Sequence, residues 1–193
     1  MKGGTDVAGE GMGLGVPIAL YPDGWHYPGT ATVTNLSTGR VTIWQKTFDL
    51  DEVGGDAAHD YKFQRAPSVG RVQVTYTITA GGAEIAVRSL GLSPGVQQVN
   101  ILNEESAAFN DYSDSAGTDL GPAFTNWQSV RGSWARLQSG SLGIEWGQET
   151  AGNSQFQAGR EFNPPGFNWA GMDYLFGPNF TAVDYTVTIR RAR

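Results

Sequence analysis

Strict alternation of apolar and polar residues is the sequence feature that most constrains the fold of this chain. Residues 72–79 are apolar at every second position, namely Val72, Val74, Tyr76 and Ile78, with Gln or Thr between them. Successive side chains of a β-strand point to opposite faces, so this period of two predicts a half-buried strand. Residues 183–190 repeat the pattern, and a last strand of this regularity typically pairs inside a sheet.

Turn residues connect these segments to further strand candidates. Ala80, Gly81 and Gly82 precede a second alternating run at residues 84–90, which predicts an antiparallel hairpin. Residues 91–95 match the letters of a G-x-S-x-G nucleophile elbow. That motif needs a helix after the serine, and Pro94 and Gly95 break one, so we interpret the segment as a hairpin turn. Less regular strand candidates are residues 30–35, 41–49, 96–102, 142–146 and 155–161.

Only residues 104–109 resemble a helix. Asn103 is a suitable N-cap, and Glu104 and Glu105 would occupy the first turn. One short helix cannot organise a chain of 193 residues. We therefore predict an all-β fold, an antiparallel β-sandwich of jelly-roll-like topology; a closed barrel is the alternative, because strand patterns do not determine closure.

The length of the chain is typical of one domain. Residues 1–15 contain six glycines and are expected to form a flexible lead, followed by a single domain at residues 16–193.

Charge and composition exclude several classes of partner. The net charge of −6 argues against nucleic acid, which requires a basic surface. No run of 18 apolar residues exists, so we expect a soluble protein without a membrane partner. The chain has no cysteine, which leaves the compartment open, with an extracellular location slightly favoured over a cytoplasmic one.

Residues 159–180 carry six aromatic rings among prolines, glycines and asparagines. We interpret this segment as an aromatic loop, on which a sugar ring could stack while amides bind its hydroxyls; the alternative is that the rings cap the β core. The expected ligand-binding residues, here and in other segments, are Trp25, Trp127, Trp134, Phe167, Asn168, Trp169 and Tyr174.

Catalytic candidates are few. Glycoside hydrolysis needs two carboxyl groups about 5 to 10 Å apart, and Glu161 and Asp173 bracket most of the aromatic segment. Glu145 lies beside a tryptophan, although an ordinary solvent-facing strand residue would look the same. His26 follows Asp23 in a loop-like segment and is a candidate general base.

A calcium site is the one cofactor that the sequence suggests. Asp111, Asp114 and Asp119 surround two serines, and carboxylates, hydroxyls and carbonyls are the ligands that Ca²⁺ prefers. A plain turn is the alternative, because Asp and Ser are common turn formers.

The aromatic residues Trp25, Trp127, Trp134 and Trp169, with neighbouring Asn and Gln, resemble those of β-sandwich modules attached to carbohydrate-active enzymes. Residues 72–104 are similar to part of the large sandwich of sugar mutarotases. The two histidines and the glutamate that mutarotases use are not found in their usual order, so this resemblance implies a fold and not epimerase chemistry.

These patterns predict a non-catalytic module that binds a polysaccharide or oligosaccharide. One alternative is a structural module that docks on another domain or subunit, and a second is a glycan-active hydrolase or mutarotase-like enzyme that uses a carboxylate pair. A glycan site should place aromatic rings beside unpaired polar groups in a hollow, whereas a protein interface should be flatter and more aliphatic.

Overall fold

The computed structural model describes residues 14–54, 62–106, 111–121, 128–129, 132–139, 142–150, 154–163, 167–176 and 184–191. Every regular element within these ranges is a β-strand. In chain order the strands are β1 (Leu14–Tyr21), β2 (Gly24–Asn35), β3 (Thr42–Gly54), β4 (Phe63–Arg65), β5 (Gly70–Thr79), β6 (Gly82–Leu92), β7 (Gln98–Ser106), β8 (Asp111–Asp114), β9 (Asp119–Gly121), β10 (Gln128–Ser129), β11 (Trp134–Ser139), β12 (Leu142–Thr150), β13 (Ser154–Asn163), β14 (Phe167–Phe176) and β15 (Asp184–Arg191).

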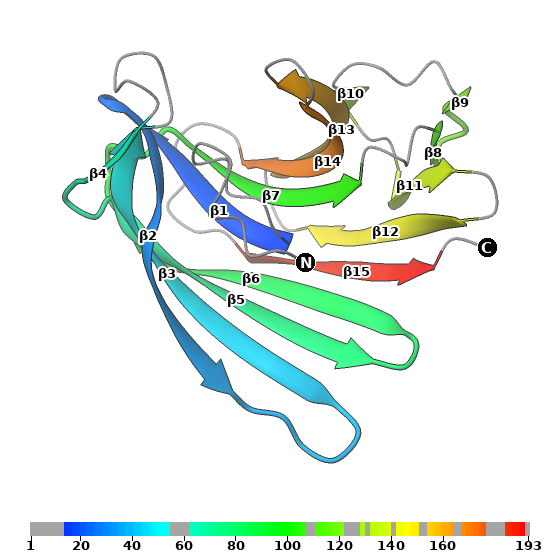
Figure 1. Cartoon of the computed structure of the whole chain (residues 1–193), viewed down its shortest axis with the longest axis horizontal. Helices are drawn as coiled ribbons and strands as arrows, with labels where there is room; N and C mark the ends of the chain where they lie inside the picture. The colour runs from blue at the N-terminus through cyan, green and yellow to red at the C-terminus, as the bar shows by residue number, and fades with distance from the viewer. Residues whose placement is uncertain are drawn as a thin grey trace.

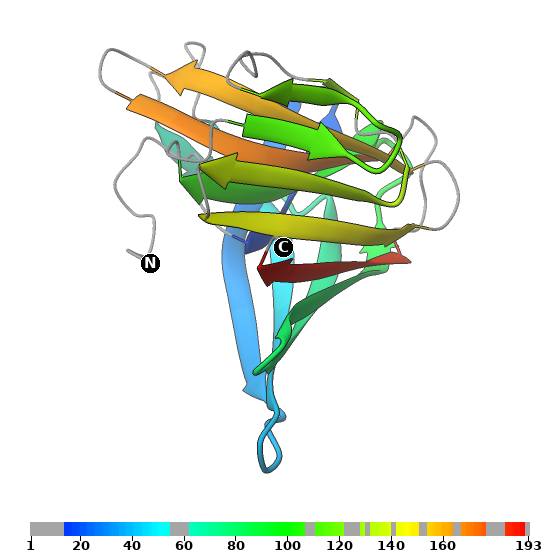
Figure 2. The ribbon, with the colours of Figure 1, turned by 90° about the vertical axis from the view of Figure 1, so that its right-hand side faces the viewer.

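The strands form an antiparallel β-sandwich. They join in the order β10-β13-β14-β7-β1-β2-β3-β5-β6-β15-β12-β11-β8-β9, and β4 pairs with β3 outside this path. The sheet is strongly curled, so that its distant strands form layers that face each other (Figure 1). Turned by 90°, the molecule shows β2 and β3 extending away from the other strands as one free end (Figure 2).

Packing around Gly15 shows that the layers meet face to face. A methyl group at Gly15 of β1 would lie 3.1 Å from Val74 Cγ1, 3.2 Å from Ile85 Cγ2 and 3.2 Å from the Tyr76 hydroxyl. β2 and β3 separate β1 from β5 in the strand order, so this contact runs across the curl. Burial raises the pKa of Tyr76 above its ordinary value.

The alternation of apolar and polar residues places the core as predicted. Val72 and Val74 are fully buried, whereas Gln73 and Thr75 between them are partly exposed. The predicted β5–β6 hairpin is present, with Thr79 opposite Gly82. β15 is central, between β6 and β12, and the less regular strand candidates all lie within or overlap observed strands.

The predicted helix at residues 104–109 is wrong over its described part. β7 continues through Ser106, with Glu104 opposite Gly171 and Ser106 opposite Trp169 of β14. Pairing with β14 satisfies the backbone groups of this segment, and such tertiary pairing outweighs a local helix-start pattern. Residues 107–109 lie outside the described ranges.

The predicted hairpin turn at residues 91–95 is also wrong. A turn is present, because the Val96 N–H donates to the Ser93 carbonyl (3.0 Å). However, β6 pairs with β5 and β15, while β7 pairs with β1 and β14. The segment therefore connects distant parts of the curled sheet and does not join two neighbouring strands.

At the N-terminus, Leu14 and Gly15 belong to β1, although the sequence places them in the flexible lead. Residues 1–13 lie outside the described ranges. No helix that could cross a membrane occurs in the part of the chain that the structure describes.

Candidate functional site

Five directly opposed residues form a row across the outer face of the sheet. Thr77 of β5 is opposite Glu84 of β6, and Glu84 is opposite Thr188 of β15. The row continues through Gly147 of β12 to Trp134 of β11. We call these five residues the Trp134 row. They alternate along their strands with core positions such as Ile85, which is why their side chains lie outside the core.

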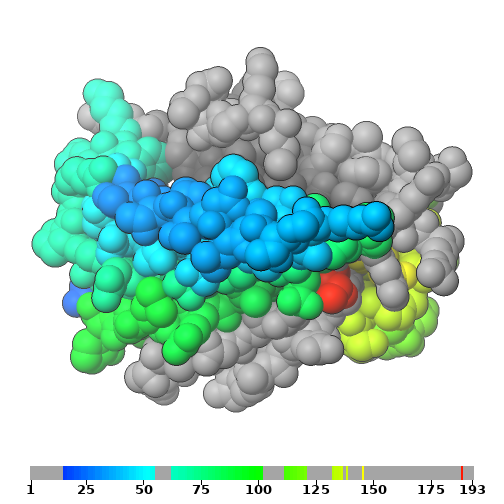
Figure 3. Space-filling view, turned by 90° about the horizontal axis from the view of Figure 1, so that it is seen from below, coloured from blue at the N-terminus to red at the C-terminus, as the bar shows by residue number. Residues whose placement is uncertain are grey.

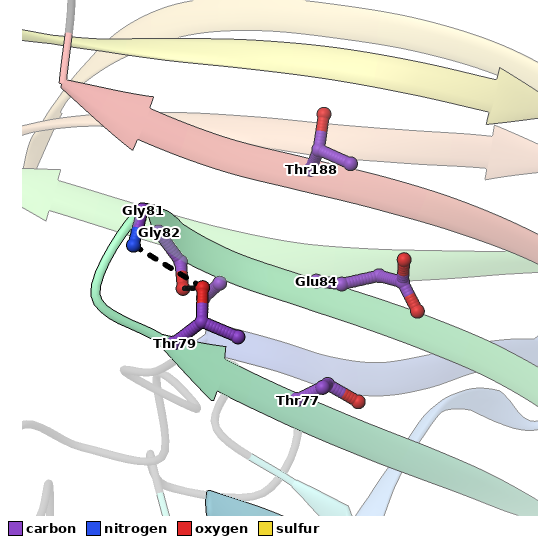
Figure 4. Close-up of a pocket in the computed structure, with 7 residues that line it drawn as sticks. Thr77, Thr79, Gly81, Gly82, Glu84 and Thr188 are labelled. Atoms are coloured by element: carbon purple, nitrogen blue, oxygen red, sulfur yellow. Dashed lines mark hydrogen bonds between the residues drawn. The ribbon is translucent and has the colours of Figure 1, made fainter. Parts of the chain in front are cut away.

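An open hollow of about 390 Å³ lies at one end of the row (Figure 4). Its lining consists of Thr77, Thr79, Gly81, Gly82, Ala83, Glu84 and Thr188. The Gly81 N–H donates to Thr79 Oγ1 (3.2 Å), and the Thr79 hydroxyl donates to the Gly82 carbonyl (3.4 Å). These bonds hold the β5–β6 turn, whose glycines leave the end of the hollow free of side chains.

Three polar side chains in this hollow are available to a ligand. Within the described part of the chain, Thr77, Glu84 and Thr188 make no side-chain hydrogen bond or ion pair. Directly opposed side chains lie about 5 Å apart, so the Glu84 carboxylate is flanked by one hydroxyl on each side. A carboxylate accepts hydrogen bonds and a hydroxyl both donates and accepts, a combination that suits a ligand with several neighbouring hydroxyls.

Trp134 supplies the aromatic end of the row. Its ring is half-buried, and the Arg136 guanidinium lies over it, 4.2 Å from the ring centroid. Gly147 has no side chain and separates Trp134 from Thr188, so the two residues are about 10 Å apart at the strand spacing. On the surface, the small red part of β15 that is coloured lies between green atoms of the β5–β6 end and yellow atoms of the β11 region (Figure 3).

Glu145 does not face solvent as an ordinary strand residue would. It is 3% exposed; its Oε2 accepts a hydrogen bond from Arg136 Nε (2.7 Å) and forms an ion pair with Arg136 Nη2 (2.6 Å). Burial of a carboxylate requires such a partner. The ion pair fixes Arg136 against Trp134; a catalytic role for Glu145 stays a prediction.

His26 is 1% exposed, and its Nε2 lies 2.9 Å from Asp23 Oδ1. Its Nδ1 has no hydrogen-bond partner among the described residues, and Tyr21 packs edge-on against the ring at a centroid distance of 5.5 Å. Asp23 therefore orients the imidazole as it would orient a general base, but burial closes the ring to substrate. A general-base role for His26 stays a prediction.

Trp25 is not part of this row. Trp25 is half-buried on β2, opposite Leu20 of β1. Five strands, β3, β5, β6, β15 and β12, separate β2 from β11 in the sheet. Trp127 lies outside the described residues.

The predicted aromatic loop is instead a pair of strands. Residues 154–163 and 167–176 form β13 and β14, which pair along their whole length. In the β14–β7 register, Tyr174 is opposite Ile101 and Phe176 is opposite Val99. Ile101 and Val99 of β7 are fully buried. The sequence did not indicate these two strands, because prolines, glycines and asparagines interrupt the period of two. The predicted binding roles of Phe167, Asn168, Trp169 and Tyr174 stay predictions.

The register also separates the predicted carboxylate pair. Glu161 is opposite Trp169, and Asp173 is four residues further along β14. At about 3.4 Å per residue and 4.8 Å between strands, their Cα atoms are roughly 14 Å apart. A hydrolase pair needs carboxyl groups about 5 to 10 Å apart, and the catalytic roles of Glu161 and Asp173 stay predictions.

The carboxylate of Asp114 accepts hydrogen bonds from the turn that follows it. Its Oδ1 accepts hydrogen bonds from the Ala116 and Thr118 N–H groups (both 3.0 Å), and its Oδ2 accepts one from the Tyr112 hydroxyl (2.9 Å). Among the described residues, no group of three or more acidic, histidine or cysteine side chains is placed to hold a metal. Calcium at Asp111, Asp114 and Asp119 stays a prediction.

Two features were missed by the sequence analysis. Thr77 and Glu84 stood in the polar phase of a recognised hairpin, but no local pattern indicated that Thr188 and Trp134 would join them. Val33, Trp44 and Ile78 are 52%, 44% and 47% exposed and share one face of β2, β3 and β5. They occupy apolar positions of the alternation, and that pattern predicts burial. The sequence does not indicate that this part of β2, β3 and β5 extends beyond the strands that cover the rest of the inner face.

No protein-family model and no curated protein sequence matches the chain. Solved structures do. The α-N-acetylgalactosaminidase NagBb from Bifidobacterium bifidum, as a quadruple mutant, is similar with a TM-score of 0.56 and 13% identity, over 95% of this chain and 31% of that one. Its complex with GalNAc gives 0.55 and 12%, over 92% and 30%.

A GH36 α-galactosidase, AgaA from Geobacillus stearothermophilus, is similar with a TM-score of 0.50 and 10% identity, over 92% of this chain and 30% of that one. At these identities the similarity concerns the fold alone. The chain spans about 30% of the length of these enzymes.

Proposed function

We propose that this protein is a non-catalytic carbohydrate-binding β-sandwich module and that the Trp134 row is its ligand-binding surface. One observation carries the proposal: a single row places an aromatic ring on the same face as an unengaged carboxylate and two unengaged hydroxyls, beside a hollow. This is the combination expected of a glycan site and not of a flat, aliphatic interface.

The chemistry of the row suits a chain of sugar units. Glu84 accepts hydrogen bonds from two neighbouring sugar hydroxyls, and Thr77 and Thr188 donate to or accept from the next ones. A second unit along the glycan lies over the bare backbone of Gly147 and reaches the part of the Trp134 ring that Arg136 leaves uncovered. The ligand thus extends across the strands.

Two further observations support an accessory role. The structurally similar domains belong to glycosidases about three times longer than this chain, which favours a module that serves a larger carbohydrate-acting protein. In addition, Glu145, the carboxylate that lies beside Trp134, is already paired with Arg136. Glycoside hydrolysis needs two carboxylates that act together.

The first test removes single hydrogen-bonding groups without changing side-chain shape. A glycan array identifies a bound polysaccharide, and titration calorimetry then compares wild type with Thr188→Val and Glu84→Gln. Loss of one ligand hydrogen bond costs about 0.5 to 1.5 kcal/mol, or about a two- to tenfold loss of affinity. Thr42→Val is the matched control, because Thr42 is exposed on β3 outside the row.

The second test removes the ring. Trp134→Ala should weaken binding by about 1 to 3 kcal/mol, roughly 5- to 150-fold, and Trp134→Phe should recover most of it. Melting of each variant separates lost binding from lost folding. If both Trp134→Ala and Thr188→Val bind the glycan as wild type does, the Trp134 row is not the site. If wild type binds no glycan, the proposed function is wrong.

A further inference from the structure

β2 presents a long open edge. β1 pairs only with the first part of β2, through Gly24, Trp25 and His26, and β3 pairs with β2 on its other side as far as Asn35. Beyond Pro28, where the register shifts, no described strand pairs with the outer edge of β2. Figure 1 shows this part of β2 continuing past β1 toward the free end of the sheet.

The backbone groups on this edge can be assigned from the β2–β3 register. The Leu36 N–H donates to the Ile43 carbonyl (2.8 Å), so Thr34 and Thr32, which follow in steps of two, also direct their backbone groups at β3. Ala31, Val33 and Asn35 then direct theirs outward. All residues from Thr30 to Asn35 are exposed, so these outward groups are open to a new strand.

The edge has none of the features that normally block strand addition. Residues 30–35 contain no charged residue and no proline. Arg65 marks the end of the open part, because it donates to the Gly29 carbonyl (2.8 Å) and to Thr30 Oγ1 (2.7 Å). The available edge is therefore the segment from Ala31 to Asn35.

We infer that this edge pairs with the same edge of a second copy of the chain, antiparallel and about a two-fold axis. The segment is self-complementary: centred on Thr32, the pairing sets Thr32 opposite Thr32, Ala31 opposite Val33 and Thr30 opposite Thr34 of the other copy. Polar residues then meet polar ones and apolar residues meet apolar ones, and no like charges face each other. Ala31 and Val33, whose backbone groups point outward, form the hydrogen-bonded pairs.

One exposed apolar residue lies in the proposed seam. Val33 is 52% exposed on the open edge, and Trp44 of β3 and Ile78 of β5 share its face of the sheet. In the proposed pairing Val33 lies opposite Ala31 of the other copy, so part of its exposed apolar surface is covered. The dimer is independent of the Trp134 row, which lies on the opposite face of the sheet.

The test compares two substitutions at one position. Ala31→Pro removes an N–H that the β2–β3 pairing does not use, whereas Ala31→Thr keeps it and favours a strand. Sedimentation equilibrium over a wide range of concentration should give a dimer for wild type and Ala31→Thr, and a monomer for Ala31→Pro. Val33→Lys, a second edge variant that places a charge opposite Ala31 of the other copy, should also be monomeric.

Hydrogen exchange locates the contact. Exchange of the Val33 amide should slow as protein concentration rises, while the Thr32 and Thr34 amides, which face β3, stay protected throughout. A wild-type protein that is monomeric at every concentration would overturn the inference. A dimer that persists in Ala31→Pro and Val33→Lys, or open-ended aggregation of wild type in place of a dimer, would overturn it as well.

Discussion

Substitution of Gly15 by alanine tests the packing of β1 across the curled sheet. Gly15 has a φ of +74°, and its new methyl group would lie 3.1 to 3.2 Å from side-chain atoms of Val74, Ile85 and Tyr76. The left-handed conformation costs about 1 to 2 kcal/mol in alanine, and forcing a methyl group into a packed contact costs about 1 to 3 kcal/mol. We expect a total loss of about 2 to 5 kcal/mol.

Gly39→Ala is the matched control. Gly39 has a φ of +58°, and among the described residues none other than its two chain neighbours has an atom within 4 Å of the position that its methyl group would take. It therefore carries the conformational cost without the contact, about 1 to 2 kcal/mol. The reduced freedom of the unfolded chain is the same for both variants and cancels in the comparison.

Thermal unfolding measures the difference. For a chain of this size, each kcal/mol lowers the melting temperature by about 2 to 4 °C. Gly15→Ala should melt about 4 to 20 °C below wild type, and Gly39→Ala about 2 to 8 °C below it, with Gly15→Ala the lower of the two. Equal melting temperatures would refute the packing of β1 on β5 and β6, and with it the face-to-face arrangement of the layers.

Other expected outcomes concern single groups. Because burial raises the pKa of Tyr76, the unfolded chain ionises first as pH rises above the ordinary tyrosine value of about 10. The free energy of unfolding should therefore fall above that pH, and chemical denaturation should show a smaller fall in Tyr76→Phe; identical profiles would contradict the assignment. Arg136→Met removes a partner of buried Glu145 and should lower stability by about 2 to 4 kcal/mol, whereas Glu145→Gln with Arg136→Met should recover part of the loss in urea denaturation. Melting in excess Ca²⁺ and in chelator tests the predicted site at Asp111, Asp114 and Asp119: a bound ion raises the midpoint, and equal midpoints reject the site.

The contrast between β5 and β7 shows where sequence reasoning reached its limit. The alternation in residues 72–79 is a local property, so it predicted the strand, its buried face and the hairpin with β6. In residues 104–106 the local pattern favoured a helix, and only the pairing with β14, more than sixty residues away, made them a strand. The free-energy difference between the local helix and strand preferences of such a segment is smaller than the free energy that pairing and packing contribute.

The sequence by itself determined that this chain builds antiparallel β-strands around a one-sided apolar face, because side-chain direction in a strand depends only on position along it. Tertiary structure decided which strands are neighbours, and therefore which residues meet. Thr77, Glu84, Gly147 and Thr188 join Trp134 only because β5, β6, β15, β12 and β11 are consecutive in the sheet. The open edge of β2 also depends on tertiary structure. β1 pairs with only a few residues of β2, and the rest of β1 packs across the curl. No local pattern in residues 30–35 predicts that β1 does not pair with them.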